Sequence, residues 1–168
     1  GSANLLTTLK YFGSFFIFFG NVAIYNTDTF SNIGAPGGNT AEACTGFCNL
    51  IAGNGSEGAY RAGVEGEVGI FNNYIGTNKT GTAALSNDRT AVESFEGGPT
   101  RVGAVGILEN GDEVALGNLI SGNGYQAIYF SSSYERFTPQ RIEGNLIGTD
   151  RTGTTAIPNG LANDSDIP

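Results

Sequence analysis

The chain has 168 residues, of which 16 are acidic and 8 are basic, so its formal net charge is −8. Such an acidic surface argues against nucleic acid or an anionic membrane surface as a partner. The 27 glycines argue against long helices. The longest apolar run, at 15–19, is too short to cross a bilayer. We therefore expect an all-β chain without membrane insertion.

The first forty residues are the least regular part of the chain and contain the aromatic run FFIFF. In a strand, consecutive large apolar side chains place some of their number outside the core. Two explanations stay open: the run packs against a loop of its own chain, or it docks on a second molecule through aromatic anchors. The candidate self-association residues are Phe15, Phe16, Ile17, Phe18 and Phe19.

Two cysteines, Cys44 and Cys48, frame a short step rich in turn-forming residues. A bridge between them would pin a local loop in an oxidising compartment. A metal pair is the alternative, but the chain has no His and no other Cys to complete the ligand set. We predict a disulfide, with no metal and no cofactor.

A short motif with Asn at its first position and Ile at its third returns four times, as NLIAG, NYIGT, NLISG and NLIGT. The first and third copies lie 69 residues apart, and the second and fourth lie 72 apart. Shorter spacings of 24 and 27 residues separate neighbouring copies, and the 45-residue gap between Asn73 and Asn118 is close to two further steps. The pattern predicts a solenoid with a unit of roughly 22–27 residues.

The spacing of Asn and Ile within the motif predicts two stacked columns. In a strand, residues two positions apart face the same side. Stacked copies would then superpose Ile on Ile in the core and Asn on Asn at a turn, where amides hydrogen-bond from copy to copy. The predicted core column is Ile51, Ile75, Ile120 and Ile147, and the predicted ladder is Asn49, Asn73, Asn118 and Asn145.

These units add up to one domain over residues 1–168, with about seven coils. Residues 1–40 are degenerate coils, and recognisable repeats cover 44–160. Segments 76–88 and 148–160 are too long for tight turns, so we expect them to protrude as lateral loops. An antiparallel sandwich is the competing fold, because four Asn-Gly pairs are hairpin signals: Asn54-Gly55, Asn110-Gly111, Asn123-Gly124 and Asn159-Gly160.

The stretches CTGFCNLIAGNG, NLISGNG and NLIGTDRTGTTAIPNG resemble the repeats of bacterial right-handed parallel β-helix proteins of the pectate-lyase-like superfamily. The resemblance covers roughly residues 44–160. It implies a right-handed parallel β-helix and a secreted or cell-surface setting. It does not imply an activity, because one fold carries many functions.

Enzyme chemistry has little support in the residues. Many β-helix proteins cut acidic polysaccharides, but a hydrolase-like site needs clustered Asp and a His, and the chain has no His. A lyase-like site would use an arginine, yet nothing links Arg101, Arg136 or Arg141 to acids at a repeat-consistent spacing. The densest acidic group, Glu109 with Asp112 and Glu113, lacks the spacing of a calcium loop. We name no catalytic residue.

The sequence therefore favours an extracellular structural module that associates end to end into a filament or forms part of a surface adhesin. Open rod ends present unpaired backbone and core side chains, and head-to-tail stacking of rods builds filaments. The expected partners are further copies of the chain or neighbouring coils of a larger chain. The alternative is a β-helix fragment that binds or cleaves carbohydrate, such as cell-surface polysaccharide.

Overall fold

A computed structural model describes residues 24–25, 31–35, 44, 46, 48–54, 64–65, 68–94, 100–107, 109–130 and 140–160. The aromatic run at 15–19 lies outside these residues. The described chain is all-β, with short strands separated by turns in which glycine has positive φ. No helix in this described part has the length and apolarity that a membrane crossing requires.

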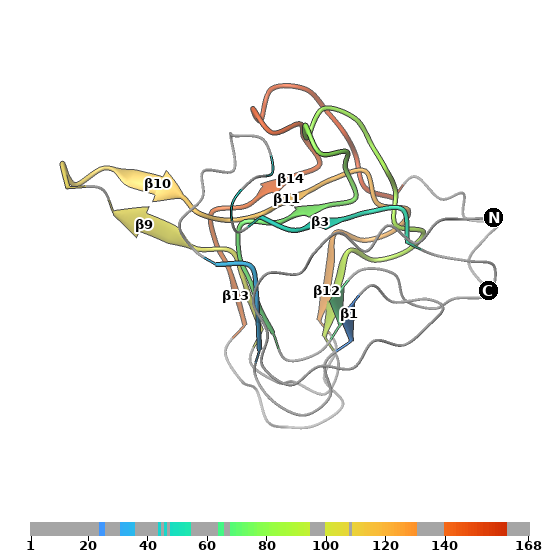
Figure 1. Cartoon of the computed structure of the whole chain (residues 1–168), viewed down its shortest axis with the longest axis horizontal. Helices are drawn as coiled ribbons and strands as arrows, with labels where there is room; N and C mark the ends of the chain where they lie inside the picture. Colours follow the sequence, from blue (N-terminus) through green and yellow to red (C-terminus); the bar gives the residue numbers. More distant parts are fainter. Residues whose placement is uncertain are drawn as a thin grey trace.

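Twelve of the described strands form three parallel four-stranded sheets, which we call A, B and C (Figure 1). Sheet A contains β1 (Ile24–Tyr25), β4 (Val64–Glu65), β7 (Val92–Ser94) and β12 (Ile128–Phe130). Sheet B contains β2 (Ser31–Ile33), β5 (Val68–Ile70), β8 (Arg101–Val102) and β13 (Arg141–Ile142). Sheet C contains β3 (Leu50–Ile51), β6 (Tyr74–Ile75), β11 (Leu119–Ile120) and β14 (Leu146–Ile147).

The chain visits sheets A, B and C in the same order four times. We call each visit a layer: β1, β2 and β3 form the first, and β12, β13 and β14 form the fourth. Figure 1 shows the three sheets on three sides of a common interior. This interior holds the main core cluster, which consists of Ile33, Ile51, Ile70, Ile75, Ala91, Val92, Val102 and Ile120.

The described residues form four layers, fewer than the roughly seven coils predicted for residues 1–168. One of the missing coils was expected in the 45-residue gap between Asn73 and Asn118. Strand β6 instead pairs directly with β11, with Tyr74 opposite Leu119 and Ile75 opposite Ile120. The additional residues between β6 and β11 form the 76–88 loop and a hairpin inserted between β8 and β11.

The inserted hairpin pairs β9 (Val105–Ile107) with β10 (Glu113–Ala115) in antiparallel register around Asn110-Gly111. It projects away from the three sheets (Figure 1). Its Ile107 side chain is 67% exposed. The hairpin signal in Asn110-Gly111 is thus confirmed locally, although the three main sheets are parallel and the antiparallel sandwich is wrong.

The two predicted lateral loops, 76–88 and 148–160, share one local fold. Each folds back on itself through one antiparallel bridge, Thr77 to Ala84 and Thr149 to Ala156. The 76–88 loop lies against the outer face of sheet C, where a Cβ on Gly81 would meet Tyr74 and Leu119 side-chain carbons at 2.8 Å. The loops pack over this face because Tyr74 and Leu119 there are apolar and need cover.

Candidate functional site

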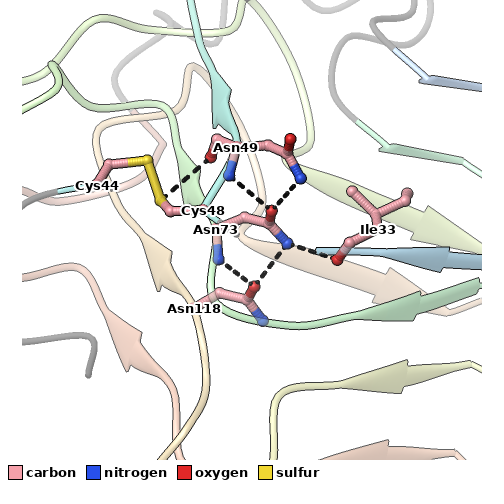
Figure 2. Close-up of a disulfide and its surroundings, with 6 residues drawn as sticks. All are labelled: Ile33, Cys44, Cys48, Asn49, Asn73 and Asn118. Atoms are coloured by element: carbon pink, nitrogen blue, oxygen red, sulfur yellow. Dashed lines mark hydrogen bonds between the residues drawn. A yellow bond between two sulfur atoms is a disulfide. The ribbon is translucent and has the colours of Figure 1, made fainter. Parts of the chain in front are cut away.

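A ladder of asparagines, buried at Asn49, Asn73 and Asn118 and half-buried at Asn145, runs along one corner of the layers (Figure 2). The side-chain oxygen of Asn73 accepts from Nδ2 of Asn49 at 2.8 Å and from its backbone nitrogen at 3.2 Å. Asn118 accepts from Asn73 in the same way, at 3.1 and 2.9 Å. Asn145 accepts from Asn118 at 2.9 and 2.8 Å. The structure therefore brings all four predicted ladder residues together.

The second hydrogen on each amide ties sheet C to sheet B. Nδ2 of Asn73 donates to the carbonyl of Ile33 at 2.9 Å, and Nδ2 of Asn118 donates to the carbonyl of Ile70 at 2.9 Å. Asn145 donates to the carbonyl of Val102 at 2.8 Å. Each of these side chains thus gives a hydrogen-bond partner to a backbone carbonyl at the bend between sheets B and C. Backbone groups need such partners when they are buried away from water.

A second ladder, which the repeated motif did not predict, lies at the other end of sheet C. Nδ2 of Asn54 donates to Asn87, that of Asn87 to Asn123, and that of Asn123 to Asn159, at 2.9, 2.9 and 2.8 Å. The available signal was an Asn three residues after the Ile in GNG at 53–55 and 122–124, with later equivalents in SND and PNG. Three members of this ladder, Asn54, Asn123 and Asn159, belong to the Asn-Gly pairs that served as hairpin signals for the competing sandwich fold, and their side chains bond to the ladder instead.

The predicted Ile column is continuous, but its last member is not in the core. Ile51 pairs with Ile75, Ile75 with Ile120, and Ile120 with Ile147, all in register. Ile75 and Ile120 are fully buried, whereas Ile147 is 44% exposed. The placement of Ile147 in the core is therefore wrong. β14 is the edge strand of sheet C, and no described strand pairs with its free edge.

The same change occurs in all three sheets at the fourth layer. In sheet B, Val102 is fully buried and its register partner Ile142 is 49% exposed. In sheet A, Val92 is fully buried and its partner Ile128 is only partly buried. At the fourth layer, the inward-facing side chains of all three sheets, Ile128, Ile142 and Ile147, are therefore left partly uncovered. We call this end of the layers the open face.

The ladders end at the same face. Asn73 donates its backbone N–H to Asn118 at 2.9 Å, and Asn123 donates its backbone N–H to Asn159 at 3.1 Å. Among the described residues, the N–H groups of Asn145 and Asn159 have no such acceptor. The open face thus combines half-exposed aliphatic side chains with donors aimed where another layer would lie.

The predicted disulfide is confirmed: Cys44 and Cys48 are bonded, with their Cα atoms 5.2 Å apart (Figure 2). Cys44 is buried with Tyr74 and Leu119 in a second core cluster, against which Cys48 packs. The backbone nitrogen of Cys44 also donates to the carbonyl of Lys79 at 3.4 Å. The bridge therefore holds its short loop beside the 76–88 loop on the outer face of sheet C.

The 148–160 loop is organised by one carboxylate. Oδ1 of Asp150 accepts from Oγ1 of Thr152 at 2.8 Å, and from the backbone nitrogens of Thr152, Thr154 and Thr155 at 3.1, 3.1 and 3.3 Å. The Thr152 hydroxyl bond is the largest cause that lowers the Asp150 pKa from 3.8 to about 2, and burial acts in the opposite direction. Asn78 holds the equivalent place in the 76–88 loop, where Oδ1 accepts from the Thr82 nitrogen at 3.0 Å.

Because the folded pKa of Asp150 is lowered, its carboxylate stabilises the fold above pH 3.8, and this stabilisation is lost as the pH falls towards about 2. An amide can accept the same bonds without titrating, as Asn78 does. We expect Asp150→Asn to fold and to lose stability relative to the parent near neutral pH, with the difference shrinking towards pH 2. Urea unfolding across this range measures it, with Asp88→Asn as the charge control. A difference that stays constant with pH would contradict the assignment.

The charged residues considered in the sequence lie at separate places within the described part of the chain. Glu109, Asp112 and Glu113 lie exposed at the hairpin. No group of three or more His, Cys, Asp or Glu is placed to hold a metal in the described ranges. On the outer face of sheet B, Glu143 lies 3.7 Å from Arg101 and 3.1 Å from Arg141. Arg136 lies outside the described residues. The open face is the candidate functional site.

The chain was compared with known protein families, curated proteins and solved structures. No protein-family model, curated protein or solved structure matches the chain.

Proposed function

We propose that the chain is a right-handed parallel β-helix that acts as a structural module outside the cell and associates end to end through its open face. The repeated order of sheets A, B and C supports the helix, because parallel strands of one sheet joined by a crossover are nearly always connected with right-handed sense. The Cys44–Cys48 disulfide is compatible with an oxidising compartment. Filament formation and a place in a surface adhesin both follow from such stacking.

The observation that carries the proposal is the change in exposure between the third and fourth layers. Val102 and Ile120 are fully buried, and their partners one layer on are about half exposed. A further β layer would bury Ile142 and Ile147, continue both asparagine ladders and pair the edge of β14. Burial of apolar surface drives such association, and edge pairing gives it direction.

The occupant we propose is a second copy of the chain, or a neighbouring coil where this module is part of a longer chain. The sequence nominates the aromatic residues Phe15, Phe16, Ile17, Phe18 and Phe19 as the complementary surface. Copies of a chain with net charge −8 repel one another, and salt screens this repulsion. Association is therefore expected to strengthen as ionic strength rises.

The test is sedimentation velocity over a range of protein and salt concentrations. The parent chain is expected to form species larger than the monomer, and the double variant Ile142→Lys with Ile147→Lys is expected to stay monomeric. Leu85→Lys is the matched control, because Leu85 is 43% exposed on the 76–88 loop, not on the open face. Deletion of residues 1–20 tests the aromatic surface in the same experiment.

Two results would contradict the proposal. One is a parent chain that remains monomeric at every concentration and salt. The other is an equal loss of association in Leu85→Lys, which would show that any added charge disrupts the contact. A folded β spectrum in each variant is the necessary control for both comparisons.

A further inference from the structure

We propose that Asn110 at the tip of the hairpin is a site of spontaneous succinimide formation and deamidation, to which other Asn-Gly pairs of the chain are resistant. This inference is independent of end-to-end association. It depends on a comparison within one molecule, because Asn110-Gly111, Asn123-Gly124 and Asn159-Gly160 share a dipeptide and differ in their surroundings. Gly55, which follows Asn54, lies outside the described residues.

The reaction needs only water as a co-reactant. The backbone nitrogen of the glycine attacks Cγ of the asparagine, forms a nitrogen–carbon bond and gives up its proton. The bond from Cγ to Nδ2 breaks, and the amide group leaves as ammonia after taking up a proton. Water then opens the cyclic imide at either carbonyl and leaves an aspartyl or an isoaspartyl linkage. No oxidation or reduction occurs.

The side-chain amide that is attacked is held by hydrogen bonds at Asn123, in the ladder, and is accessible at Asn110, in the hairpin. Nδ2 of Asn123 uses its hydrogens on Asn159 at 2.8 Å and on the carbonyl of Ile75 at 3.1 Å, and Asn123 is fully buried. Its Oδ1 accepts from Asn87. To reach the glycine nitrogen, this side chain must first leave the ladder. Asn110 is exposed, and its side chain bonds only to Asp112 within the described residues.

The backbone nitrogen of the following glycine is also held by a hydrogen bond in the ladder and is less restrained in the hairpin. The Gly124 nitrogen donates to the carbonyl of Asn87 at 2.7 Å, and the Gly160 nitrogen donates to the carbonyl of Asn123 at 2.9 Å. Those hydrogen bonds hold both nitrogens and their protons in place. The Gly111 nitrogen has no acceptor among the described residues. A Cβ added at Gly111 would meet nothing within 4 Å, so the turn there is open to water.

Asp112 gives the Asn110 side chain an arrangement suited to the reaction. Its backbone nitrogen donates to Oδ1 of Asn110 at 3.1 Å, and its Oδ2 accepts from Nδ2 at 2.7 Å. The two bonds make the carboxamide span Gly111. When Cγ is attacked, negative charge develops on Oδ1, where the Asp112 N–H already points, and such a donor stabilises it.

The product changes the hairpin, which projects from the sheets (Figure 1). Hydrolysis places a new carboxylate beside Glu109, Asp112 and Glu113 at the hairpin. An isoaspartyl linkage also adds a backbone carbon to the turn that joins β9 and β10. The hairpin of an aged molecule is therefore more acidic and has a different turn from that of a fresh one.

The test is peptide mass spectrometry of the purified chain, sampled during incubation at neutral pH. In the native protein, Asn110 is expected to convert about tenfold or more faster than Asn123 or Asn159, since those side chains must first break two or more hydrogen bonds. In urea, where the ladders are unfolded, the three rates are expected to converge. Isoelectric focusing of Asn110→Ser should lack the more acidic species that the parent accumulates.

Either of two outcomes would overturn the proposal. Equal rates at Asn110 and the ladder asparagines in the native chain would show that the fold does not protect the ladder. A preference for Asn110 that persists unchanged in urea would assign the selectivity to neighbouring residues and not to the structure.

Discussion

Replacing Asn118 by alanine is expected to lower the free energy of unfolding by about 3–5 kcal/mol. Asn118 is fully buried and is the third of the four asparagines in the first ladder. Its side chain accepts from Nδ2 and from the backbone nitrogen of Asn73, and donates to Asn145 and to the carbonyl of Ile70. Alanine removes all four bonds and leaves two buried donors on Asn73 without their acceptor.

The size of this effect comes from the groups left behind. A buried donor or acceptor that loses its partner costs about 1–3 kcal/mol, more than the net value of the bond itself. Urea unfolding of Asn118→Ala and of Asn110→Ala provides the matched comparison, because Asn110 is exposed. The exposed change should cost about 0.5 kcal/mol or less. Similar costs at the two positions would contradict the ladder as a stabilising element.

The second large effect is expected at Ile120. Ile120→Ala should cost about 2–5 kcal/mol, the range for removing a buried aliphatic side chain and leaving a cavity. Ile147→Ala, one layer on in the same column, should cost about 1 kcal/mol or less because Ile147 is 44% exposed. The pair keeps residue type, sheet and register constant, so exposure is the main difference.

This comparison must be made where the chain is monomeric, because association would bury Ile147 and raise its apparent value. Denaturant unfolding at low protein concentration meets this condition. A cost at Ile147 equal to that at Ile120 under those conditions would show that β14 is covered within one molecule. The open face would then be absent.

The repeated motif predicted both columns of sheet C because Asn and Ile two positions apart share a face of a strand. That reasoning needs no knowledge of the rest of the fold. It placed Asn49, Asn73, Asn118 and Asn145 in positions that form one ladder in the structure. It could not show that Ile147 is half exposed, because membership of a column follows from the motif whereas burial depends on the next layer.

The layer count failed for a different physical reason. A uniform period assumes that every layer has connections of similar length, and the connection between β6 and β11 contains both a folded loop and a hairpin. Loops can lengthen at small entropic cost, so strand spacing in sequence is a weak guide to spacing in the sheet. Tyr74 and Leu119 could have indicated the covering loop, because apolar side chains on the outer face of sheet C need a segment that shields them from water.

The second ladder was missed because Asn-Gly has the same local preference in two settings. The dipeptide favours a tight hairpin, and it also suits a corner where Asn bonds to the next layer. At Asn110 the hairpin forms. At Asn54, Asn123 and Asn159 the partner is another asparagine 33 or 36 residues away. Only the alignment of these pairs with the Ile column separates the two cases.

Electron microscopy of the purified chain at high ionic strength tests the central claim most directly. Four layers at the spacing of neighbouring strands, about 4.8 Å, give an axial repeat of about 19 Å for end-to-end stacking. We expect filaments with this repeat, and their loss in the Ile142→Lys and Ile147→Lys double variant. Separate particles of one chain each, at concentrations where sedimentation also finds only monomer, would contradict the account.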